Sequence, residues 1–345
     1  MNTKLQERIQ ELMEQHHFSG SIYAKSNNKE IKEVLKLSHG YANRSEQIRN
    51  QENTRFGIAS GCKLFTAIAI CQLVEQKKLA FTTTIEECLS AYSFPYLDPS
   101  ITVHQLLTHT SGIPDYFDEE VMNDFEELWV QLPMYHIRRL EDFLPLFQNE
   151  PMKHPAGSKF HYSNAGYILL GLIVEQVSQM AFQEYVEVHI FAKAGMTDSG
   201  YFEMDNLPER TALGYIETET GYRTNVYSLP ARGGSDGGAY VTAIDMMKLW
   251  EELIEGGLLS TELTDLLLTP HVQVSEGLAY GYGLWITQHK DTQQIEKYVL
   301  MGYDPGVNFR ALFYPDHSLL AVVCSNLSDG AFEVINEIEQ EIKFK

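Results

Sequence analysis

Residues 56–74 read FGIASGCKLFTAIAICQLV, and this stretch is the most informative one about the fold. From Leu64 to Val74 the side chains are apolar almost all round the helical repeat, which is typical of a helix buried between two layers. We therefore expect a helix over residues 60–78 at the centre of the molecule. The only charged residue in the quoted stretch is Lys63, and a buried lysine needs a partner or a function.

The sequence on both sides of this helix alternates between sheet and helix patterns. Helices are expected at 3–16, at 243–255 after a capping box at 242–245, and at 332–343; strands are expected at 20–24, 31–37, 280–288, 296–302, 309–314 and 319–325, with a turn at 26–28. Residues 80–205 show mostly helical periods interrupted by prolines. The sequence therefore predicts an α+β fold, with an antiparallel sheet flanked by the terminal helices and an inserted, mostly helical domain. We expect residues 1–79 and 206–345 to form the sheet domain and residues 80–205 the insertion.

Composition and charge exclude several classes of protein. The chain has 345 residues, of which 44% are hydrophobic, so it can bury a large core and is not disordered. Its 26 Lys and Arg against 47 Asp and Glu give a net charge of −21, which argues against nucleic acid as a partner. No apolar run approaches the roughly 20 residues of a membrane-spanning helix, and residues 1–10 lack the apolar core of an export signal.

These features favour a cytoplasmic protein as the sequence stands, or an extracellular or periplasmic one if a leader has been removed. No phosphate-binding loop, dinucleotide fingerprint or His-Glu-x-x-His pattern occurs, so we expect no cofactor and no metal. His104 and His109 stand five residues apart, which is wrong for ligands on one helix face, and we expect structural roles for both. The cysteines show no Cys-x-x-Cys spacing, and we expect free thiols at Cys62, Cys71, Cys88 and Cys324. The oligomeric state stays open.

Ser60 and Lys63 form a Ser-x-x-Lys pattern, whose spacing places two side chains on one face of a helix. An amine beside a hydroxyl can act as its general base, so Ser60 is a candidate nucleophile and Lys63 its proton acceptor. The alternative is a lysine that only pairs with a carboxylate or carbonyl group. A second match, residues 26–29, lies in an expected polar turn, where nothing would desolvate the lysine.

Residues 162–164 read YSN, directly before the apolar helix expected from Tyr167. A loop held by a rigid element is a favourable place for catalytic side chains. The alternative is that Ser163 or Asn164 only caps the helix, and residues 41–43 are a second Tyr-x-Asn match in an expected turn. The acidic segment 115–127 is either a solvated helix face or a lid beside the site.

Residues 233–237 read GGSDG and match Gly-x-Ser-x-Gly, the nucleophile pattern of α/β-hydrolases, which makes Ser235 a rival to Ser60. That nucleophile needs a strand running directly into the turn and a helix running directly out of it. Here Pro230 lies just upstream, and the next expected helix does not begin until after Thr242. We therefore favour a glycine-rich turn.

Three stretches taken in order carry a resemblance to a known family. Residues 56–63 (FGIASGCK), 101–114 (ITVHQLLTHTSGIP) and 155–167 (PAGSKFHYSNAGY) closely resemble the class C β-lactamase-like serine hydrolases, a family that includes penicillin-binding DD-peptidases and related esterases. Residues 195–199, 280–283 and 305–306 also look like this family, so the similarity spans about residues 18–326. Each motif is weak alone, but together and in this order they are specific.

The resemblance implies a role for each matching residue. Ser60 would be the acylated nucleophile, Lys63 its proton acceptor, and Tyr162 the phenol that passes a proton to the leaving group and then activates water. Asn164 would orient the substrate's amide. The oxyanion hole would be the backbone N–H groups of Ser60 and of Tyr303 on an edge strand. The fold that the resemblance implies is the α+β layout expected above.

One position departs from the family pattern. Where the family has Lys or His before a small residue and Gly, this chain has Leu300-Met301-Gly302. Leu300, Gly302 and Tyr303 are therefore expected at the substrate-binding edge, without the cation that would bind a substrate carboxylate. The alternative is that Arg310, on the neighbouring expected strand, supplies the missing charge.

Together these features predict a serine acyl hydrolase of the β-lactamase, DD-peptidase or esterase type. Its partner would be a small molecule, namely a β-lactam, a peptide or an ester. The alternative is a penicillin-binding or sensor module that acylates slowly or only binds, without efficient turnover. The sequence does not separate the two, because turnover leaves no sequence pattern.

Overall fold

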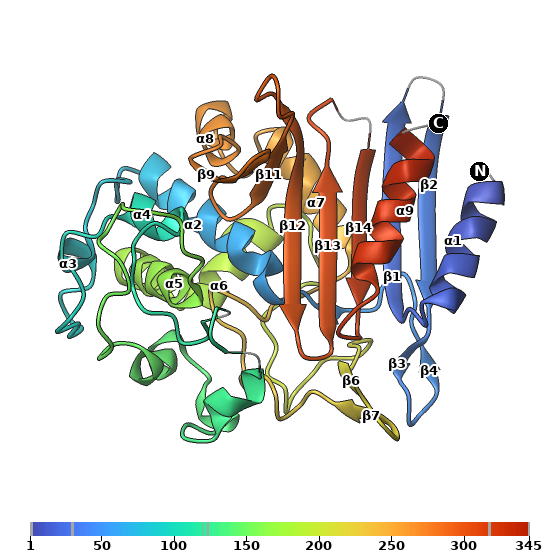
Figure 1. Cartoon of the computed structure of the whole chain (residues 1–345), viewed down its shortest axis with the longest axis horizontal. Helices are drawn as coiled ribbons and strands as arrows, with labels where there is room; N and C mark the ends of the chain where they lie inside the picture. The colour runs from blue at the N-terminus through green and yellow to red at the C-terminus, as the bar shows by residue number, and fades with distance from the viewer. Residues whose placement is uncertain (1–2, 29–30, 119, 123, 317–318, 344–345) are drawn as a thin grey trace.

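A computed structural model describes residues 3–28, 31–118, 120–122, 124–316 and 319–343 of the chain. Within these residues the largest element is a sheet of eight strands in the order β2-β1-β14-β13-β12-β11-β10-β9 (Figure 1). All of its neighbouring strands are antiparallel. β1 (Gly20–Asn28) pairs with β14 (Leu319–Ser325), so the first and last strands of the chain lie side by side, next to the edge strand β2.

The other elements fall into three groups. The large sheet also contains β2 (Ile31–His39), β9 (Val272–Ser275), β10 (Leu278–Tyr280), β11 (Trp285–Gln288), β12 (Ile295–Asp304) and β13 (Val307–Phe313). Two-stranded sheets are formed by β3 (Tyr41–Asn43) with β4 (Ile48–Arg49), β5 (Phe56–Gly57) with β8 (Tyr240–Val241), and β6 (Tyr215–Thr218) with β7 (Gly221–Thr224). The helices are α1 (Thr3–Gln15), α2 (Lys63–Glu75), α3 (Ile85–Cys88), α4 (Val103–Leu107), α5 (Asn164–Ser178), α6 (Phe182–Val186), α7 (Ala243–Ile254), α8 (Thr261–Leu267) and α9 (Ala331–Lys343), with short helical segments η1 (Ala59–Cys62), η2 (Phe125–Trp129), η3 (Met134–His136), η4 (Leu140–Leu146) and η5 (Glu187–Phe191).

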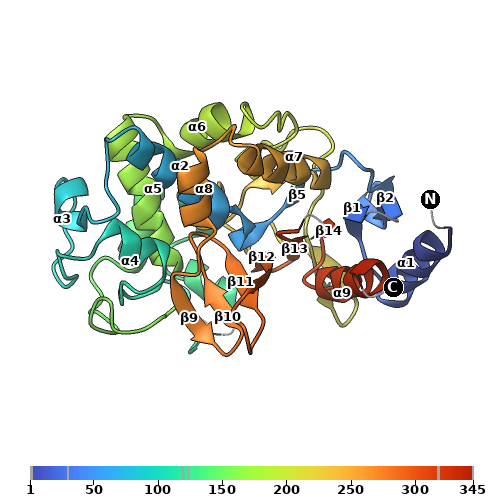
Figure 2. The same cartoon turned by 90° about the horizontal axis from the view of Figure 1, so that it is seen from above.

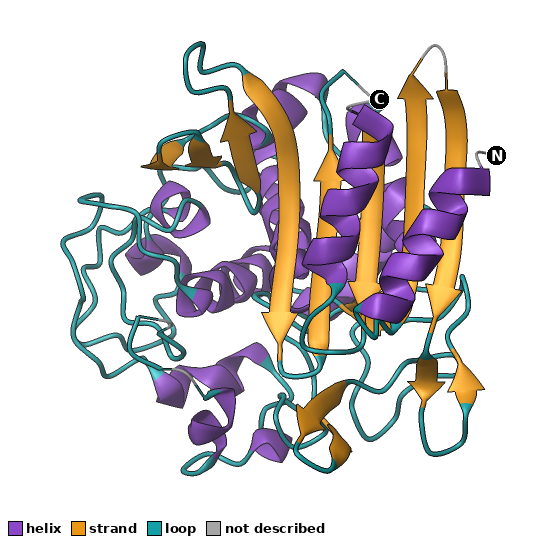
Figure 3. Cartoon of the chain, turned by 45° about the vertical axis from the view of Figure 1, so that its right-hand side comes forward, coloured by secondary structure: helices purple, strands orange, loops and turns teal. Residues whose placement is uncertain are grey.

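Helices cover both faces of the large sheet. α1 and α9 lie beside each other on one face, as Figure 3 shows, and α7 covers the opposite face (Figure 2). Because successive side chains of a strand point to opposite faces, β12 contributes to both cores. Leu300 belongs to the core shared with α2, whereas Val299 belongs to the core beneath α1 and α9. The predicted α+β architecture, with terminal helices flanking an antiparallel sheet, is confirmed.

The central helix lies where the apolar stretch predicted it. Every residue of α2 from Lys63 to Leu73 is buried, and α2 packs against α5 in a block of helices and loops beside the sheet (Figure 1). The helix begins at Lys63 rather than at Ser60, because residues 59–62 form the 3-10 segment η1. The boundaries predicted for the inserted domain, at residues 80 and 205, stay a prediction.

Some strand predictions were wrong at the ends. The turn expected at 26–28 is part of β1, which continues to Asn28, so Ser26 is a buried strand residue. The second Tyr-x-Asn match, at 41–43, is strand β3 rather than a turn. The single strand expected at 280–288 is two strands, since the chain turns at Gly283, where φ is +78° and a side chain would be strained. A pattern of alternating apolar residues does not show such a turn.

The described residues contain no single helix that is long and apolar enough to cross a membrane. Only α5 taken together with residues 182–191 passes such a test, and the two parts are bent by 77°. α5 is a core helix, buried from Asn164 to Val174.

Candidate active site

Ser60 sits where η1 meets α2. A 3-10 segment has about three residues per turn, so residues three apart are nearly eclipsed, and this brings Ser60 and Lys63 onto one side. The turn is closed by the Gly61 N–H, which donates to the Ile58 carbonyl oxygen over 2.8 Å. Ala59, just before the serine, has a φ of +45°, a left-handed conformation that is uncommon for alanine and is often found at functional sites.

Lys63 is 1% exposed, and its ammonium nitrogen contacts three oxygen atoms. Nζ lies 2.9 Å from Ser60 Oγ, 2.8 Å from Asn164 Oδ1 and 2.8 Å from the backbone oxygen of Asp236. The alternative prediction was a lysine that only pairs with a carboxylate or carbonyl group. Lys63 does contact carbonyl oxygens, those of the Asn164 side chain and the Asp236 backbone. These contacts do not replace the contact with Ser60.

This set of partners suits both protonation states of Lys63. The ammonium can donate one hydrogen to each of the three oxygens. The neutral amine can donate its two hydrogens to Asn164 Oδ1 and the Asp236 carbonyl, neither of which can donate in return. Its lone pair then faces Ser60 Oγ and can accept the hydroxyl proton. A proton can thus move from Ser60 to Lys63 without leaving a buried donor unpaired.

Tyr162 lies beside Lys63. Its ring centre lies 4.9 Å from Lys63 Nζ, and the ring is packed between His109, at 4.4 Å, and Trp285, at 6.2 Å and nearly parallel. The next residue, Ser163, caps α5 by accepting the Gly166 N–H over 3.1 Å. The YSN motif therefore starts the helix and also places Tyr162 beside Lys63. The predicted capping role and the predicted placement of catalytic side chains are thus compatible.

Asn164 is the first residue of α5, and both ends of its amide are engaged within the protein. Its Oδ1 faces Lys63 Nζ, and its Nδ2 donates to Asp115 Oδ2 over 3.1 Å. Asn164 also lines the cavity described below. The substrate-orienting role expected for Asn164 stays a prediction. In the structure, the direct contact of its carbonyl oxygen is with Lys63 Nζ.

The expected oxyanion edge is the second half of β12. β12 is not at the edge of the large sheet, but its pairing with β11 ends at Val299, and from there it runs against η1. A Cβ at Gly302 would come within 2.0 Å of the Ile58 backbone oxygen, so only glycine allows this approach. Tyr303 follows, with its side chain 65% exposed and lining the cavity.

The structure places Leu300 and Arg310 away from the cavity. Leu300 is 2% exposed and packs in the core, and neither residue is among those that line the cavity. The Arg310 guanidinium lies 3.5 Å from Met301 Sδ and 5.1 Å from the Phe332 ring of α9, on the other face of the sheet. The alternative that Arg310 supplies the missing cation was therefore wrong. Strand alternation accounts for this, because Met301 and Arg310 are register partners.

The rival nucleophile is buried. Ser235 is 0% exposed, and its hydroxyl donates to the backbone oxygen of Tyr167 over 2.7 Å. The two histidines are structural, as expected: His109 Nδ1 accepts the Ser163 N–H over 3.1 Å, and His104 Nδ1 lies 2.8 Å from the Tyr282 hydroxyl. The four cysteines are free thiols.

A cavity of about 590 Å³ opens beside Ser60, between η1, the end of β12 and the acidic segment 115–127. That segment borders the cavity through residues on both sides of the undescribed positions 119 and 123. The charged residues in the lining are acidic, namely Asp124, Glu126, Asp236 and Asp304, with Arg223 as the one cation among the described residues. Arg223 pairs with Glu126 over 2.7 Å. The described lining residues of the cavity therefore offer no unpaired cation to a substrate carboxylate.

Comparison with known proteins shows the family of the chain. The family model described as Beta-lactamase matches residues 5–342. The chain belongs to the β-lactamase family.

Several known proteins are similar to the chain. A crystal structure of a penicillin-binding protein from Bacillus halodurans is 56% identical, with a TM-score of 0.91, over 96% of this chain and 99% of that one. Penicillin-binding protein 4* of Bacillus subtilis is 27% identical over 98% of this chain and 73% of its own length. D-amino acid amidase from Ochrobactrum anthropi, at 19% identity, covers 100% of this chain and 99% of that one and shares the fold, with a TM-score of 0.80. The chain is thus a member of the serine hydrolase family with the β-lactamase fold.

Two acidic residues of the site in this β-lactamase family member were not predicted from the sequence. Asp115 binds Asn164, and Asp236 supplies a backbone oxygen to Lys63 and a carboxylate that accepts the Tyr116 hydroxyl. The sequence feature that points to a role for Asp115 is its position directly after residues 101–114, which resemble the family. The role of Asp236 left no signal, because a backbone carbonyl is the same in every residue.

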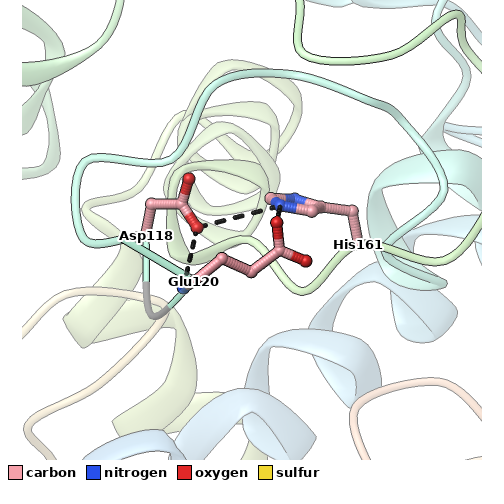
Figure 4. Close-up of side chains that lie close together, drawn as sticks. All are labelled: Asp118, Glu120 and His161. Carbon is pink, nitrogen blue, oxygen red and sulfur yellow. Dashed lines mark hydrogen bonds and ion pairs between the residues drawn. The ribbon is translucent and has the colours of Figure 1, made fainter. Parts of the chain in front are cut away.

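A second cluster of charged groups lies beside Tyr162. Figure 4 shows Asp118, Glu120 and His161 pointing toward one another, with His161 Nε2 3.9 Å from Asp118 Oδ1 and 3.7 Å from Glu120 Oε2. Lys153 already contacts the other oxygen of Asp118 and neutralises part of its charge. We interpret the cluster as a polar network that ties the acidic segment to the loop before Tyr162. Lys153 and Asp118 form its ion pair, whereas burial lowers the pKa of His161 and favours the neutral ring.

Proposed function

We propose that this chain is a serine acyl hydrolase that works through an acyl-enzyme on Ser60. The observation that supports this most directly is the 2.9 Å contact between Lys63 Nζ and Ser60 Oγ, with the lysine's other donors held by Asn164 and Asp236. A base, a nucleophile and an orienting group in contact are the arrangement that activates a hydroxyl. The cavity beside Ser60 provides room for an acyl substrate.

In the acylation step, Ser60 Oγ attacks the carbonyl carbon of the substrate while its proton moves to the neutral amine of Lys63. The carbonyl oxygen gains negative charge, which the backbone N–H groups of Ser60 and Tyr303 would stabilise. The carbon–heteroatom bond then breaks as the leaving group takes the hydroxyl proton of Tyr162, which leaves a phenolate on Tyr162 beside the ammonium of Lys63. The products are the free alcohol or amine and an ester on Ser60.

Deacylation reverses the roles of the same groups. Tyr162, which lies close to the Lys63 cation, would take a proton from a water molecule as the water attacks the Ser60 ester. The Ser60–acyl bond then breaks, Ser60 recovers its proton, and a carboxylic acid leaves. The exposure of both Ser60 and Tyr162 is intermediate rather than zero, so water can reach the ester.

The substrate we favour is a neutral or amine-bearing ester or amide rather than an anionic β-lactam. The cavity lining carries four acidic residues and one arginine, which is paired, and position 300 has no cation. A substrate carboxylate would meet repulsion and no charge-assisted hydrogen bond, which is worth about ten- to a hundredfold in binding. The fold shared with a D-amino acid amidase is compatible with an amide substrate.

Intact-mass measurements test the proposed function. The wild-type protein is mixed with a penicillin or with a neutral activated ester, and the adduct is followed over time. We expect a transient adduct with the ester, a weak or slow one with the penicillin, and none with Ser60→Ala. A persistent adduct would favour the slow penicillin-binding or sensor module instead. Labelling that survives in Ser60→Ala but is lost in Ser235→Ala would overturn the assignment of the nucleophile.

A further inference from the structure

Asp115 accepts two hydrogen bonds at the start of α5. Its Oδ1 accepts the backbone N–H of Ala165 over 2.8 Å, and its Oδ2 accepts the side-chain N–H of Asn164 over 3.1 Å. Asn164 in turn presents Oδ1 to Lys63 Nζ, which contacts Ser60 Oγ. Asp115 is therefore the outer end of a chain of contacts that reaches the nucleophile through Asn164 and Lys63.

The carboxylate determines which way the Asn164 amide points. An ionised carboxylate only accepts hydrogen bonds, and an ammonium only donates them. With its Nδ2 on Asp115 and its Oδ1 on Lys63, Asn164 satisfies both. The flipped amide would place an oxygen against the carboxylate and N–H groups against the ammonium, so both contacts would become repulsive. The observed orientation is thus the one that stabilises a proton on Lys63.

We propose that Asp115 is a positioning residue that fixes the Asn164 amide so that its carbonyl oxygen stabilises the ammonium formed on Lys63 during acylation of Ser60. This inference rests on the function proposed above and adds a residue to its machinery. Asp115 does not touch the nucleophile, and it acts only through Asn164. Removing its charge should therefore weaken the base without changing how substrates fit the cavity.

Other charged groups surround this chain of contacts. Asp115 faces Lys63 on α2 and the Asp236 carboxylate in the loop before β8, while Tyr116 is its neighbour in sequence. Burial raises the pKa of the Asp115 carboxyl to about 7, and its hydrogen bonds and Lys63 oppose that rise. Burial also raises the pKa of the Asp236 carboxyl, and the charge of Lys63 opposes that rise. Asp236 accepts a hydrogen bond from the Tyr116 hydroxyl. A pH profile must therefore be read against variants rather than from wild type alone.

A double-mutant cycle separates positioning through Asn164 from a general structural role. The acylation rate with a neutral activated ester is measured in wild type, Asp115→Asn, Asn164→Ala and the double variant. The pH is kept well above the pKa of about 7 of the Asp115 carboxyl, so that this group is ionised. We expect Asp115→Asn to slow acylation about ten- to a hundredfold, the worth of a hydrogen bond to a charged group, and less than about threefold once Asn164 is already alanine. Glu127→Gln, at an exposed position of the same acidic segment that does not line the cavity, is the control and should stay near the wild-type rate. Equal losses in both backgrounds would overturn the proposal.

A second measurement does not depend on turnover. In protein labelled with 13C at lysine Cε, the Lys63 signal, assigned by its loss in Lys63→Ala, is followed against pH. We expect it to reach its neutral position at lower pH in Asp115→Asn than in wild type, because the ammonium has lost support. An unchanged titration would overturn the proposal. If wild type forms no adduct on Ser60 but the shift is present, the proposed function fails and the positioning role stands.

Discussion

The two sides of Ser60 are built in opposite ways. On the lysine side, Lys63, Asn164 and Asp236 are buried, and each nitrogen donor has an oxygen partner. On the cavity side, Tyr303 is exposed and the lining is acidic. The buried side is rigid because moving any member would leave a buried donor unpaired, whereas the open side is solvated and can accept different groups.

We infer from this difference that one side of Ser60 controls the reaction rate and the other side controls substrate selectivity. Substitutions on the lysine side should change the rate for every substrate by a similar factor, since they act on the shared proton transfer. Substitutions on the cavity side should instead change the ratio between substrates of different charge.

The largest effect is expected from the proton-transfer pair. Lys63→Ala and Tyr162→Phe should each slow acylation or deacylation by about 10²- to 10⁴-fold, the usual worth of positioned proton transfer. The factor should be similar for neutral and anionic substrates. Because the two groups share one proton network, the double variant should lose much less than the product of the single losses. Single-turnover kinetics followed by intact mass measures all four proteins.

Lys159→Ala is a matched control for this pair, because Lys159 lies exposed on the same loop as Tyr162. It should keep the wild-type rate. Losses that multiply strictly in the double variant would show that Lys63 and Tyr162 act independently, and the shared network would have to be abandoned.

The next effect concerns stability at the boundary between core and cavity. Leu300→Lys places a charge in the core at a position that is 2% exposed, and a buried unpaired charge costs about 3 to 5 kcal/mol. Tyr303→Lys, three residues along the same strand but exposed, should change the free energy of unfolding by less than about 0.5 kcal/mol. Urea unfolding compares the two variants. A stable Leu300→Lys protein with faster penicillin turnover would show that position 300 opens toward the substrate after all.

The sequence predicted the buried side of the site well because its chemistry is written in side-chain types. Lys63 is the only charge in residues 56–74, and Tyr162 and Asn164 stand at the start of another apolar helix, so pattern and spacing locate all three. The antiparallel sheet and its flanking helices follow from the same periodicities. The exact start of α2 did not follow, because the 3-10 segment η1 has the same apolar character as the helix it precedes.

The open side could not be predicted in the same way. Whether Leu300 or Tyr303 faces the cavity depends on strand register, and a shift of one residue exchanges the two faces. The same holds for Arg310, which faces α9. Asp236 reaches Lys63 through its backbone, within a run of glycines that resembled a plain turn. Local patterns carry no information about which backbone atoms a fold brings together.

A smaller effect should appear in the pH dependence of stability. Because the pKa of Asp115 is raised to about 7 in the folded protein, its carboxyl favours folding below its unfolded pKa of about 4, and this contribution is lost as pH rises through about 7. Asp115→Asn removes this loss. Relative to wild type, the variant should therefore gain stability between pH 4 and about 8, by no more than about 4 kcal/mol. Denaturant unfolding at several pH values measures the trend, with Glu127→Gln, at an exposed position of the same segment, as the control. A constant difference would contradict it.

The smallest expected effect is a change of selectivity on the open side. Tyr303→Lys keeps the backbone N–H that would stabilise the oxyanion and adds a cation at an exposed position lining the cavity. We expect the ratio of kcat/KM for a carboxylate-bearing substrate over a neutral ester to rise about tenfold, at the low end of a charge-assisted hydrogen bond, because the position is solvated.

Two comparisons separate this charge effect from a loss of the tyrosine ring. Tyr303→Gln removes the ring without adding a charge, so it should leave the ratio near that of wild type. Raising the ionic strength should shrink the gain in Tyr303→Lys, since the Debye length falls from about 8 Å at 0.15 M to about 3 Å at 1 M salt. Asp304, next in the chain, will offset part of the new charge, so Tyr303→Lys combined with Asp304→Asn should give the larger shift. If both substrates change by the same factor in Tyr303→Lys, the cavity side would be acting on the reaction itself, and the division between the two sides of Ser60 would not hold.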